Sequence, residues 1–384
     1  MMRIVVASIC LLFLCSCVPI VTYRKAPDVN PADVDMNKDA GRGGPLTVNV
    51  HLQNWPDMAF VIDTGWNVTT FDKSLEPELG RRLGSVPVMT TGGKVWVDLY
   101  NAPDLYLGGT QLVTGAFVAT MDLQSVSYVS THPIMGILGT DVLRNYCIQL
   151  DFAGSKIRFL DYRRSGKSHW GVPFRLKYEK DGMISIATNL VGAPASSSAI
   201  DTGYVSDGWL VPALYGQWTN HSLSAAGEVR FPDAVLGGKI YTNVDFSLDF
   251  FLDPNIQKKW KWSENGIGLF FLARNLVTLD FPEKMIYLKQ TSAGPLSFDL
   301  DADSPMSFLC RLKAKGKLPG FSKDDEITVN GSPKSVYLTK ITKSSDPSRY
   351  HYTVVRSPDG NGWKLIKAWR TDDKGKVLEL YPLN

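Results

Sequence analysis

Short apolar runs, separated by glycine, proline, asparagine and aspartate, recur along most of this chain. They include LTVNVHL at 46–52, KIRFLDY at 156–162 and MISIATNL at 183–190. Alternation with a period of two residues predicts strands, and long stretches with a helical period of 3.6 residues are scarce. Two short segments that follow glycines, 140–146 and 269–275, are the helix candidates. The pattern therefore predicts an all-β fold.

An internal repeat divides the strand-rich part of the chain into two halves. Asp63-Thr64-Gly65 ends the apolar run FVI, and the same three residues recur as Asp201-Thr202-Gly203 after SAI. Each copy is followed by an LGG segment, at 107–109 and 236–238, and then by a glycine-rich segment that leads to Leu-Asp-Phe. Three landmarks in the same order twice indicate duplicated structural units. A duplication without any chemistry would leave the same pattern.

The chemistry of the repeat centres on the two aspartates. A carboxylate at the end of a buried strand is costly when it is charged and alone. Two such carboxylates that meet between the repeats cannot both ionise easily, so they share a proton. One can then act as a general base and the other as a general acid on a water molecule held between them. The threonine hydroxyls can bond across the two halves, and the glycines allow sharp turns and close approach.

These features resemble a family of known enzymes. VIDTG and AIDTG, each followed by an apolar segment that ends in glycine (ILG at 137–139 and IG at 267–268), are similar to bacterial pepsin- and retropepsin-like aspartic proteases with both lobes in one chain. The resemblance covers about 46–290 and implies a bilobal pepsin-like β-barrel fold without metal or cofactor. It implies a catalytic pair, Asp63 and Asp201; turns built by Thr64, Gly65, Thr202 and Gly203; and ψ-loop glycines, Gly139 and Gly268.

The resemblance also implies a mobile flap over the cleft. The segment VMTTGGKVWVDLY at 88–100 is the candidate, with Thr91, Gly92 and Gly93 at its tip. An ordinary hairpin would have the same sequence. The chain departs from the family after each Asp-Thr-Gly, where Trp66 and Tyr204 replace a small residue. A catalytically inactive peptide-binding protein is therefore the alternative to an active enzyme.

The C-terminal part carries a second resemblance. GFSKDDEITVNG at 320–331 is similar to a conserved stretch of PDZ domains, with Asp325, Ile327, Val329, Asn330 and Gly331 in matching positions. It implies a PDZ-like domain at 300–384 that binds peptide C-termini by strand addition. A small β appendage without a ligand is the alternative. From Cys310 onward the chain has 15 lysines and arginines against 8 aspartates and glutamates, whereas the whole chain has a net charge of only +3.

The N-terminus predicts export. One arginine precedes an apolar run that is too short to span a membrane and that ends in Leu-Cys-Ser-Cys. This ending resembles a bacterial lipobox, with Cys17 as the lipidated residue and Cys15 as the second choice. A polar segment at 18–45 is typical of a tether. We therefore expect a lipid-anchored protein of the bacterial cell envelope, with an ordinary secreted protein as the alternative.

Together these interpretations give one domain plan and one activity. The plan is a signal peptide at 1–17, a tether at 18–45, an N-terminal lobe at 46–166, a C-terminal lobe at 167–295 and a small domain at 300–384. The activity is that of an aspartic endopeptidase acting on peptide or protein substrates. The chain has no G-x-S-x-G, no H-E-x-x-H and no phosphate-binding loop, and its five histidines are scattered. Nothing in the pattern predicts binding of nucleic acid.

Overall fold

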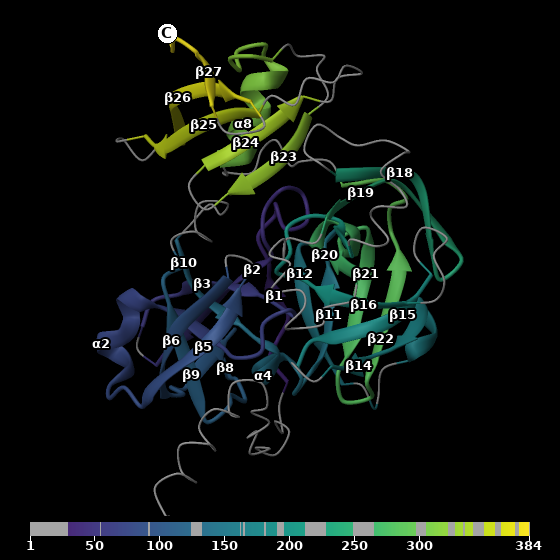
Figure 1. Cartoon of the computed structure of the whole chain (residues 1–384). Helices are drawn as coiled ribbons and strands as arrows, with labels where there is room; N and C mark the ends of the chain where they lie inside the picture. Colours follow the sequence, from purple (N-terminus) through teal and green to yellow (C-terminus); the bar gives the residue numbers. More distant parts are fainter. Residues whose placement is uncertain are drawn as a thin grey trace, which may run out of the picture.

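The computed structural model shows a protein built almost entirely of strands (Figure 1). It describes residues 30–53, 55–90, 93–123, 133–161, 163, 166–179, 182–189, 196–211, 228–248, 265–296, 305–321, 327–332, 335–340, 349–357, 362–372 and 376–383. The described strands form four sheets, of nine, seven, six and five strands. The prediction of an all-β fold is confirmed.

The nine-stranded sheet contains the first aspartate. Its strand β3 (Met58–Ile62) is buried and runs directly into Asp63. It lies beside β10 (Ile134–Leu138) in parallel, and β10 in turn pairs with β4 (Thr70–Asp72). The full order is β5 (Gly84–Thr90), β6 (Gly93–Asn101), β9 (Phe117–Met121), β4, β10, β3, β2 (Thr47–Leu52), β7 (Leu105–Leu107) and β8 (Thr110–Gln111).

The seven-stranded sheet repeats this arrangement around the second aspartate. Strand β16 (Ser196–Asp201) pairs in parallel with β20 (Asn265–Gly268), which pairs in antiparallel fashion with β17 (Gly208–Leu210). The full order is β14 (Lys177–Tyr178), β15 (Ile184–Thr188), β16, β20, β17, β19 (Lys239–Leu248) and β18 (Glu228–Leu236). The repeat seen in the sequence is therefore also a repeat of strand topology.

The six-stranded sheet joins the two halves of the repeat. Its central strands, β11 (Cys147–Asp151) and β21 (Asn275–Asp280), are the equivalent Leu-Asp segments of the two copies, and they pair with each other. The order is β1 (Val34–Asp35), β12 (Lys156–Leu160), β11, β21, β22 (Met285–Gln290) and β13 (Val172–Arg175). Strand β1 lies in the segment predicted as a tether, where Met36 and Ala40 are also buried.

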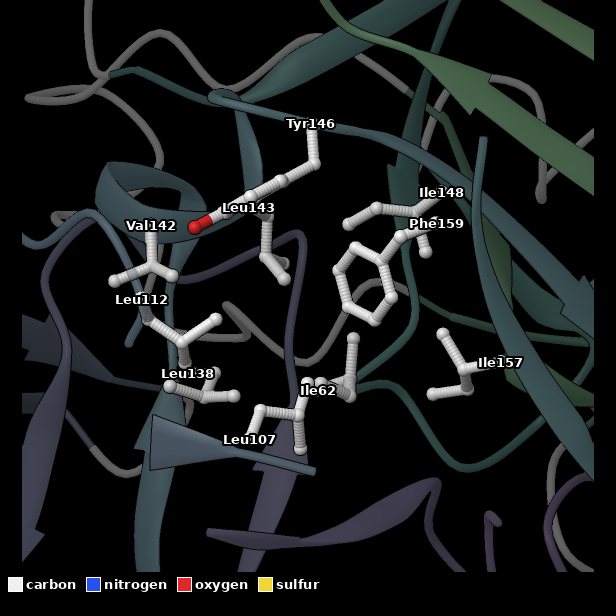
Figure 2. A pocket seen from close by; sticks show the side chains of 10 residues that line it. All are labelled: Ile62, Leu107, Leu112, Leu138, Val142, Leu143, Tyr146, Ile148, Ile157 and Phe159. Atoms are coloured by element: carbon white, nitrogen blue, oxygen red, sulfur yellow. The ribbon is translucent and has the colours of Figure 1, made fainter. Parts of the chain in front are cut away.

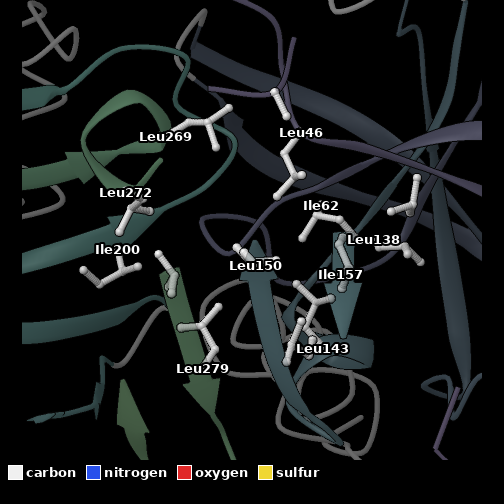
Figure 3. Close-up of a cluster of buried hydrophobic side chains, with 14 of the residues drawn as sticks. Leu46, Ile62, Leu138, Leu143, Leu150, Ile157, Ile200, Leu269, Leu272 and Leu279 are labelled. Carbon is white, nitrogen blue, oxygen red and sulfur yellow. The ribbon is translucent and has the colours of Figure 1, made fainter. Parts of the chain in front are cut away.

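One large apolar core runs through both halves (Figure 3). Ile62 and Ile200, the residues directly before the two aspartates, are both buried in it. Short helices follow the repeated glycine segments: α4 (Thr140–Leu143) and α7 (Leu269–Leu272). Both are one turn long and end before the predicted boundaries. The other described helices before the C-terminal part are η1 (Lys73–Leu75), α2 (Glu76–Leu79) and η2 (Lys167–His169).

The C-terminal part has its own small core. The helix α8 (Pro305–Ala314) precedes five antiparallel strands that pair in chain order: β23 (Ile327–Ser332), β24 (Ser335–Lys340), β25 (Arg349–Arg356), β26 (Trp363–Thr371) and β27 (Val377–Leu380). Leu309, Leu318, Tyr352 and Ala368 are buried between helix and sheet. In Figure 1 this sheet stands apart from the other three. Across the described part of the chain, no helix combines the length and apolar character needed to span a membrane.

Candidate active site

The two aspartates lie together where the halves of the repeat meet. The carboxyl group of each aspartate lies against the glycine of the opposite turn, and each carboxyl group shifts the pKa of the other. Each is placed by its strand: the amide of Asp63 donates to the carbonyl of Leu138 at 3.1 Å, and Asp201 lies opposite Gly268 in the parallel pair β16–β20. Two equivalent strands, each held by its glycine segment, therefore bring the carboxyl groups face to face.

The threonines tie the two turns together. The amide of Thr64 donates to Thr202 Oγ1 at 3.0 Å, and the amide of Thr202 donates to Thr64 Oγ1 at the same distance. Each hydroxyl then donates to the carbonyl of the residue before the opposite aspartate, Thr64 to Ile200 and Thr202 to Ile62, both at 2.7 Å. All four bonds are inaccessible to water, so the geometry of the pair is fixed by groups that have no competing partner. The predicted bonding of the hydroxyls across the two halves is present.

The glycines are required by close approach. A Cβ added to Gly65 would lie 2.6 Å from Cγ of Asp201, and one added to Gly203 would lie 2.3 Å from Cγ of Asp63. Each glycine amide also donates to the aspartate of its own turn, at 2.8 Å. A side chain at either position would push the two carboxyl groups apart.

The electrostatics of the pair differ between its members. Burial raises the pKa of Asp63 well above the usual value of an aspartate, and the neighbouring charge and hydrogen bond of Asp201 raise it further. Burial also raises the pKa of Asp201. The amides of Gly203 and Tyr204 and the interaction with Asp63 lower it, but by less than burial raises it. Asp201 receives two backbone N–H groups, at 2.8 and 3.1 Å, and Asp63 receives one. The amide donors therefore favour the ionised form of Asp201 more than that of Asp63.

The bulky residues after each turn pack against apolar residues of the strands that carry the aspartates. Trp66 packs against a cluster that contains Val61, and Tyr204 packs against a cluster that contains Ala199. Since side chains alternate along a strand, Val61 shares a sheet face with Asp63, and Ala199 shares one with Asp201. Trp66 is held by a bond from Nε1 to a threonine hydroxyl at 2.8 Å. Both aromatic residues therefore pack on the sheet faces that carry the aspartates.

The predicted ψ-loop glycines lie directly beside the turns. A Cβ on Gly139 would come within 2.9 Å of the carbonyl oxygen of Trp66, and one on Gly268 within 2.4 Å of that of Ser206. The amide of Thr140 donates to the Trp66 carbonyl at 2.8 Å, and the amide of Leu269 donates to the Tyr204 carbonyl at the same distance. The glycine segments therefore hold the chain that leaves each turn.

Two buried carboxylates support these segments, and sequence reasoning missed both. Thr69 Oγ1 donates to Asp141 at 2.9 Å in the first half. In the second half Arg274 is fully buried and donates to Asp207 at 2.7 Å. Thr69 and Asp207 each stand six residues after the aspartate of their own half, a spacing that could have drawn attention to them. Nothing in the sequence pairs Asp207 with Arg274, because the two are far apart along the chain.

The candidate flap is a hairpin of β5 and β6. Gly93 pairs with Thr90, so it belongs to strand β6, whereas the prediction placed it at the tip. Thr91 and Gly92 lie outside the described residues, as does the predicted lipidation site, Cys17. On the outward face of the hairpin, Trp96 is 63% exposed.

Other candidate sites offer less. Among the residues the structure describes, no group of three or more histidines, cysteines, aspartates or glutamates could hold a metal ion. Figure 2 shows a pocket lined only by apolar side chains and Tyr146, among them Ile62, the residue before Asp63. The Tyr146 hydroxyl accepts the amide of Val113 at 2.9 Å. This pocket is part of the core and has no group suited to acid–base chemistry.

Comparisons with known proteins do not identify a family. No family model matches the chain, and a search of curated proteins finds no match. Among solved structures, basic 7S globulin from soybean is similar with 13% identity and a TM-score of 0.42, covering 69% of this chain and 97% of that protein. Conglutin gamma, a basic 7S globulin from lupine seeds, is similar with 13% identity and a TM-score of 0.42, covering 68% and 96%.

These findings correct the family assignment made from the sequence. The two similar structures named above are seed globulins rather than pepsin- or retropepsin-like proteases, and no family model, whether of proteases or of PDZ domains, matches the chain. The assignment rested on two three-residue motifs and a few glycines. Such residues are selected by local turn geometry, so they carry little information about ancestry. The identification as a pepsin-like protease with a PDZ-like domain is therefore wrong.

Proposed function

We propose that the chain hydrolyses peptide bonds, with Asp63 and Asp201 as a proton-sharing pair. The observation that carries this proposal is the placement of both carboxyl groups where two equivalent turns are bonded to each other, each against the glycine of the opposite turn, with burial raising the pKa of both. Surface carboxylates repel each other and ionise separately, whereas a pair that shares one proton supplies an acid and a base at the same place. The proposal rests on this site and on no relationship to a known family.

The asymmetry of the pair assigns the roles. Asp201, with two amide donors, is the ionised base, and Asp63 is the protonated acid. Asp201 takes a proton from a water molecule while the oxygen of that water bonds to the peptide carbonyl carbon. At the same time Asp63 gives its proton to the carbonyl oxygen. The tetrahedral intermediate then collapses: the C–N bond breaks, Asp201 passes its proton to the leaving nitrogen, and Asp63 recovers a proton from a hydroxyl. One water is consumed and both carboxyl groups return to their starting states.

The architecture suits this chemistry. We propose two related lobes that each supply one aspartate, followed by a separate small domain. The threonine bonds hold the pair without help from substrate, so little reorganisation is needed when the reaction begins. In this proposal the hairpin of β5 and β6 closes over an extended substrate and excludes water.

The test is a cleavage assay on the full chain. Purified protein is incubated with a mixed peptide library between pH 3 and 7, and products are identified by mass spectrometry. We expect cleavage that is lost in Asp63→Asn and in Asp201→Asn, and that is blocked by a statine-containing peptide. Asp161→Asn, at an exposed position, is the matched control and should keep full activity. Cleavage that survives both active-site substitutions would refute the proposal.

The pH profile of the same assay tests the roles. Activity requires one proton on the pair, so it falls on the acid side as Asp201 is protonated and on the alkaline side as Asp63 is ionised. Because the pKa of Asp63 is raised well above its usual value, we expect the alkaline limb to lie clearly above the pH at which an ordinary aspartate ionises. A profile with only one limb would contradict the shared proton.

The alternative function is an inactive peptide-binding protein. Trp66 and Tyr204 favour it, because large side chains beside the carboxyl groups reduce the space for a substrate. In that case the chain binds library peptides with the same affinity in the parent and in Asp63→Asn, and no product forms at any pH. Turnover that depends on both aspartates excludes this alternative.

The cellular setting remains a proposal from the sequence. We infer export through the N-terminal signal, with lipidation at Cys17 and anchoring in the bacterial cell envelope, or secretion without an anchor. Peptide binding by the C-terminal domain is part of the same proposal. Metabolic labelling with a lipid precursor, in the parent and in Cys17→Ala, distinguishes the anchored form from the secreted one.

A further inference from the structure

Among the residues that the structure describes, the last strand of the C-terminal sheet, β27, has no strand paired with its outer edge. Strand β27 pairs with β26 on one side, and every one of its four residues is exposed. Val377, Leu378 and Leu380 are 52%, 47% and 65% exposed, and Ile366 on β26 is 49% exposed. We call these four residues the edge patch. Globular proteins usually cover, shorten or charge such an edge, because it invites pairing with another strand.

The main chain of β27 has groups that point to the open side. The amide of Tyr381 donates to the carbonyl of Ala368 at 2.9 Å, and Glu379 lies opposite Arg370. Bonded and non-bonded pairs alternate in an antiparallel ladder, so Leu380, between these positions, presents its N–H and C=O to the open edge. Figure 1 shows β27 on the side of the sheet that faces away from the two lobes, so the lobes leave this edge accessible.

The surroundings of the edge patch are basic. Lys367 on β26 and Lys376, directly before β27, are exposed near it, and Lys364 is exposed farther along β26. The carboxylate of Asp372 accepts the amide of Lys376 and is one of the acids here. The acid on β27, Glu379, already lies 3.6 Å from the guanidinium of Arg370. The excess of lysine and arginine in the whole C-terminal part agrees with this local balance. An occupant of the edge therefore gains from negative charge.

We propose that the β27 edge binds an extended peptide strand that carries both apolar and acidic side chains. Its main chain bonds to the open groups at Leu380, its apolar side chains cover the edge patch, and its carboxylates lie near the three lysines. A second copy of this chain is a poorer occupant, because edge-to-edge pairing brings two basic sheets together. An anionic membrane would attract the lysine side chains, but it would leave the outward N–H and C=O groups of Leu380 without hydrogen-bond partners. This proposal does not depend on peptidase activity.

The experiment measures binding of a defined probe to the full chain. The probe is a fluorescein-labelled octapeptide of alternating valine and glutamate, followed by fluorescence anisotropy, with Asp63→Asn as the parent so that no probe is cleaved. We expect saturable binding, at least tenfold weakened when alternate backbone amides of the probe are methylated and when lysine replaces glutamate. If the methylated probe binds as tightly as the unmethylated one, the proposal is overturned. This comparison uses one protein throughout, so it does not depend on the folding of a substituted chain.

Variants locate the site. Leu380→Pro removes the outward N–H without touching the bonds to β26, and should weaken binding at least tenfold. Leu380→Ala keeps that N–H and should weaken it only about threefold. Replacing Lys364, Lys367 and Lys376 together by glutamine should weaken binding about tenfold. The matched control, which replaces Lys177, Lys239 and Lys289 on the lobes, changes net charge equally and should bind as the parent does.

Two further outcomes would also overturn the proposal. One is cosedimentation with anionic phospholipid vesicles that is lost in the lysine variant, together with no binding of the probe. The other is a concentration-dependent dimer, by sedimentation velocity, that Leu380→Pro abolishes. Probe binding that Leu380→Pro leaves within twofold of the parent would place the peptide elsewhere on the chain.

Discussion

Asp141 should make the stability of this protein fall as pH rises. Asp141 is only 8% exposed, and its carboxyl group accepts a bond from Thr69 Oγ1 at 2.9 Å. Burial raises its pKa from 3.8 to about 6, although the bonds from Thr69 and the amide of Val142 oppose this. Among the contributions to this pKa, Arg144 is the only cation and has a smaller effect than those hydrogen bonds. Between about pH 4 and pH 6, the folded chain therefore holds a proton at Asp141 that the unfolded chain has already lost.

The size of the effect follows from the shift. A raised pKa in the folded state means that stability is fully present below the unfolded pKa, near 4, and is lost as pH rises through about 6. At 1.36 kcal/mol per pKa unit, the shift of Asp141 corresponds to about 3 kcal/mol between these limits. Asp141→Asn keeps an oxygen that accepts from Thr69 and cannot ionise. The variant should be more stable than the parent by up to about 3 kcal/mol at pH 7, and nearly equal to it at pH 4.

Urea unfolding at pH 4, 5, 6 and 7, followed by tryptophan fluorescence, measures this difference. The aspartate pair also titrates, so the informative quantity is the variant minus the parent at each pH. Asp151→Asn is a control for which the stability difference should have the opposite sign. Bonds from Gly154 and Arg158 outweigh burial and lower the pKa of Asp151. Removing this charge should therefore destabilise the folded chain most at neutral pH. A difference between Asp141→Asn and the parent that stays constant from pH 4 to pH 7 would refute the reasoning.

Three other substitutions test the site through unfolding and activity. Thr64→Val leaves a buried carbonyl and a buried amide without partners and should cost roughly 2–5 kcal/mol in urea unfolding, whereas Thr64→Ser should restore most of it. Gly203→Ala should abolish cleavage, because its Cβ would lie 2.3 Å from the opposite carboxyl carbon; Gly294→Ala, with its nearest neighbour at 3.5 Å, should behave as the parent does. Arg274→Met leaves the buried carboxylate of Asp207 without its cationic partner, and should destabilise the folded protein by roughly 3–5 kcal/mol. The double variant Arg274→Met with Asp207→Leu should lose much less stability, because no buried charge is left unpaired.

Much of the site could be predicted from the sequence because its parts are local. An apolar run that ends in Asp-Thr-Gly specifies a buried strand, a carboxylate and a turn within a few residues, and the repeat places two such units in equivalent positions. The bonding of Thr64 and Thr202 across the halves followed from that symmetry. The glycine segments were recognisable for the same reason, since Gly139 and Gly268 stand at matching places in the two copies.

Other features depended on contacts between distant segments. Part of the predicted tether adds strand β1 to the sheet that joins the halves, which its polar composition did not indicate. Gly93 pairs within a strand because hairpin register is set by the partner strand. The family assignment failed because short motifs specify local geometry and leave the rest of the chain undetermined.

The sequence by itself determined the strand-rich fold, the repeat and the two aspartates at its centre. Periodicity and turn residues act over a few positions, so they can be recognised without a structure. Only the tertiary structure decided how many backbone amides donate to each carboxyl group, because that depends on how each turn is held. It alone also joined Arg274 to Asp207 and left the edge of β27 open. Burial and pairing depend on the whole arrangement of the chain, and no local pattern contains them.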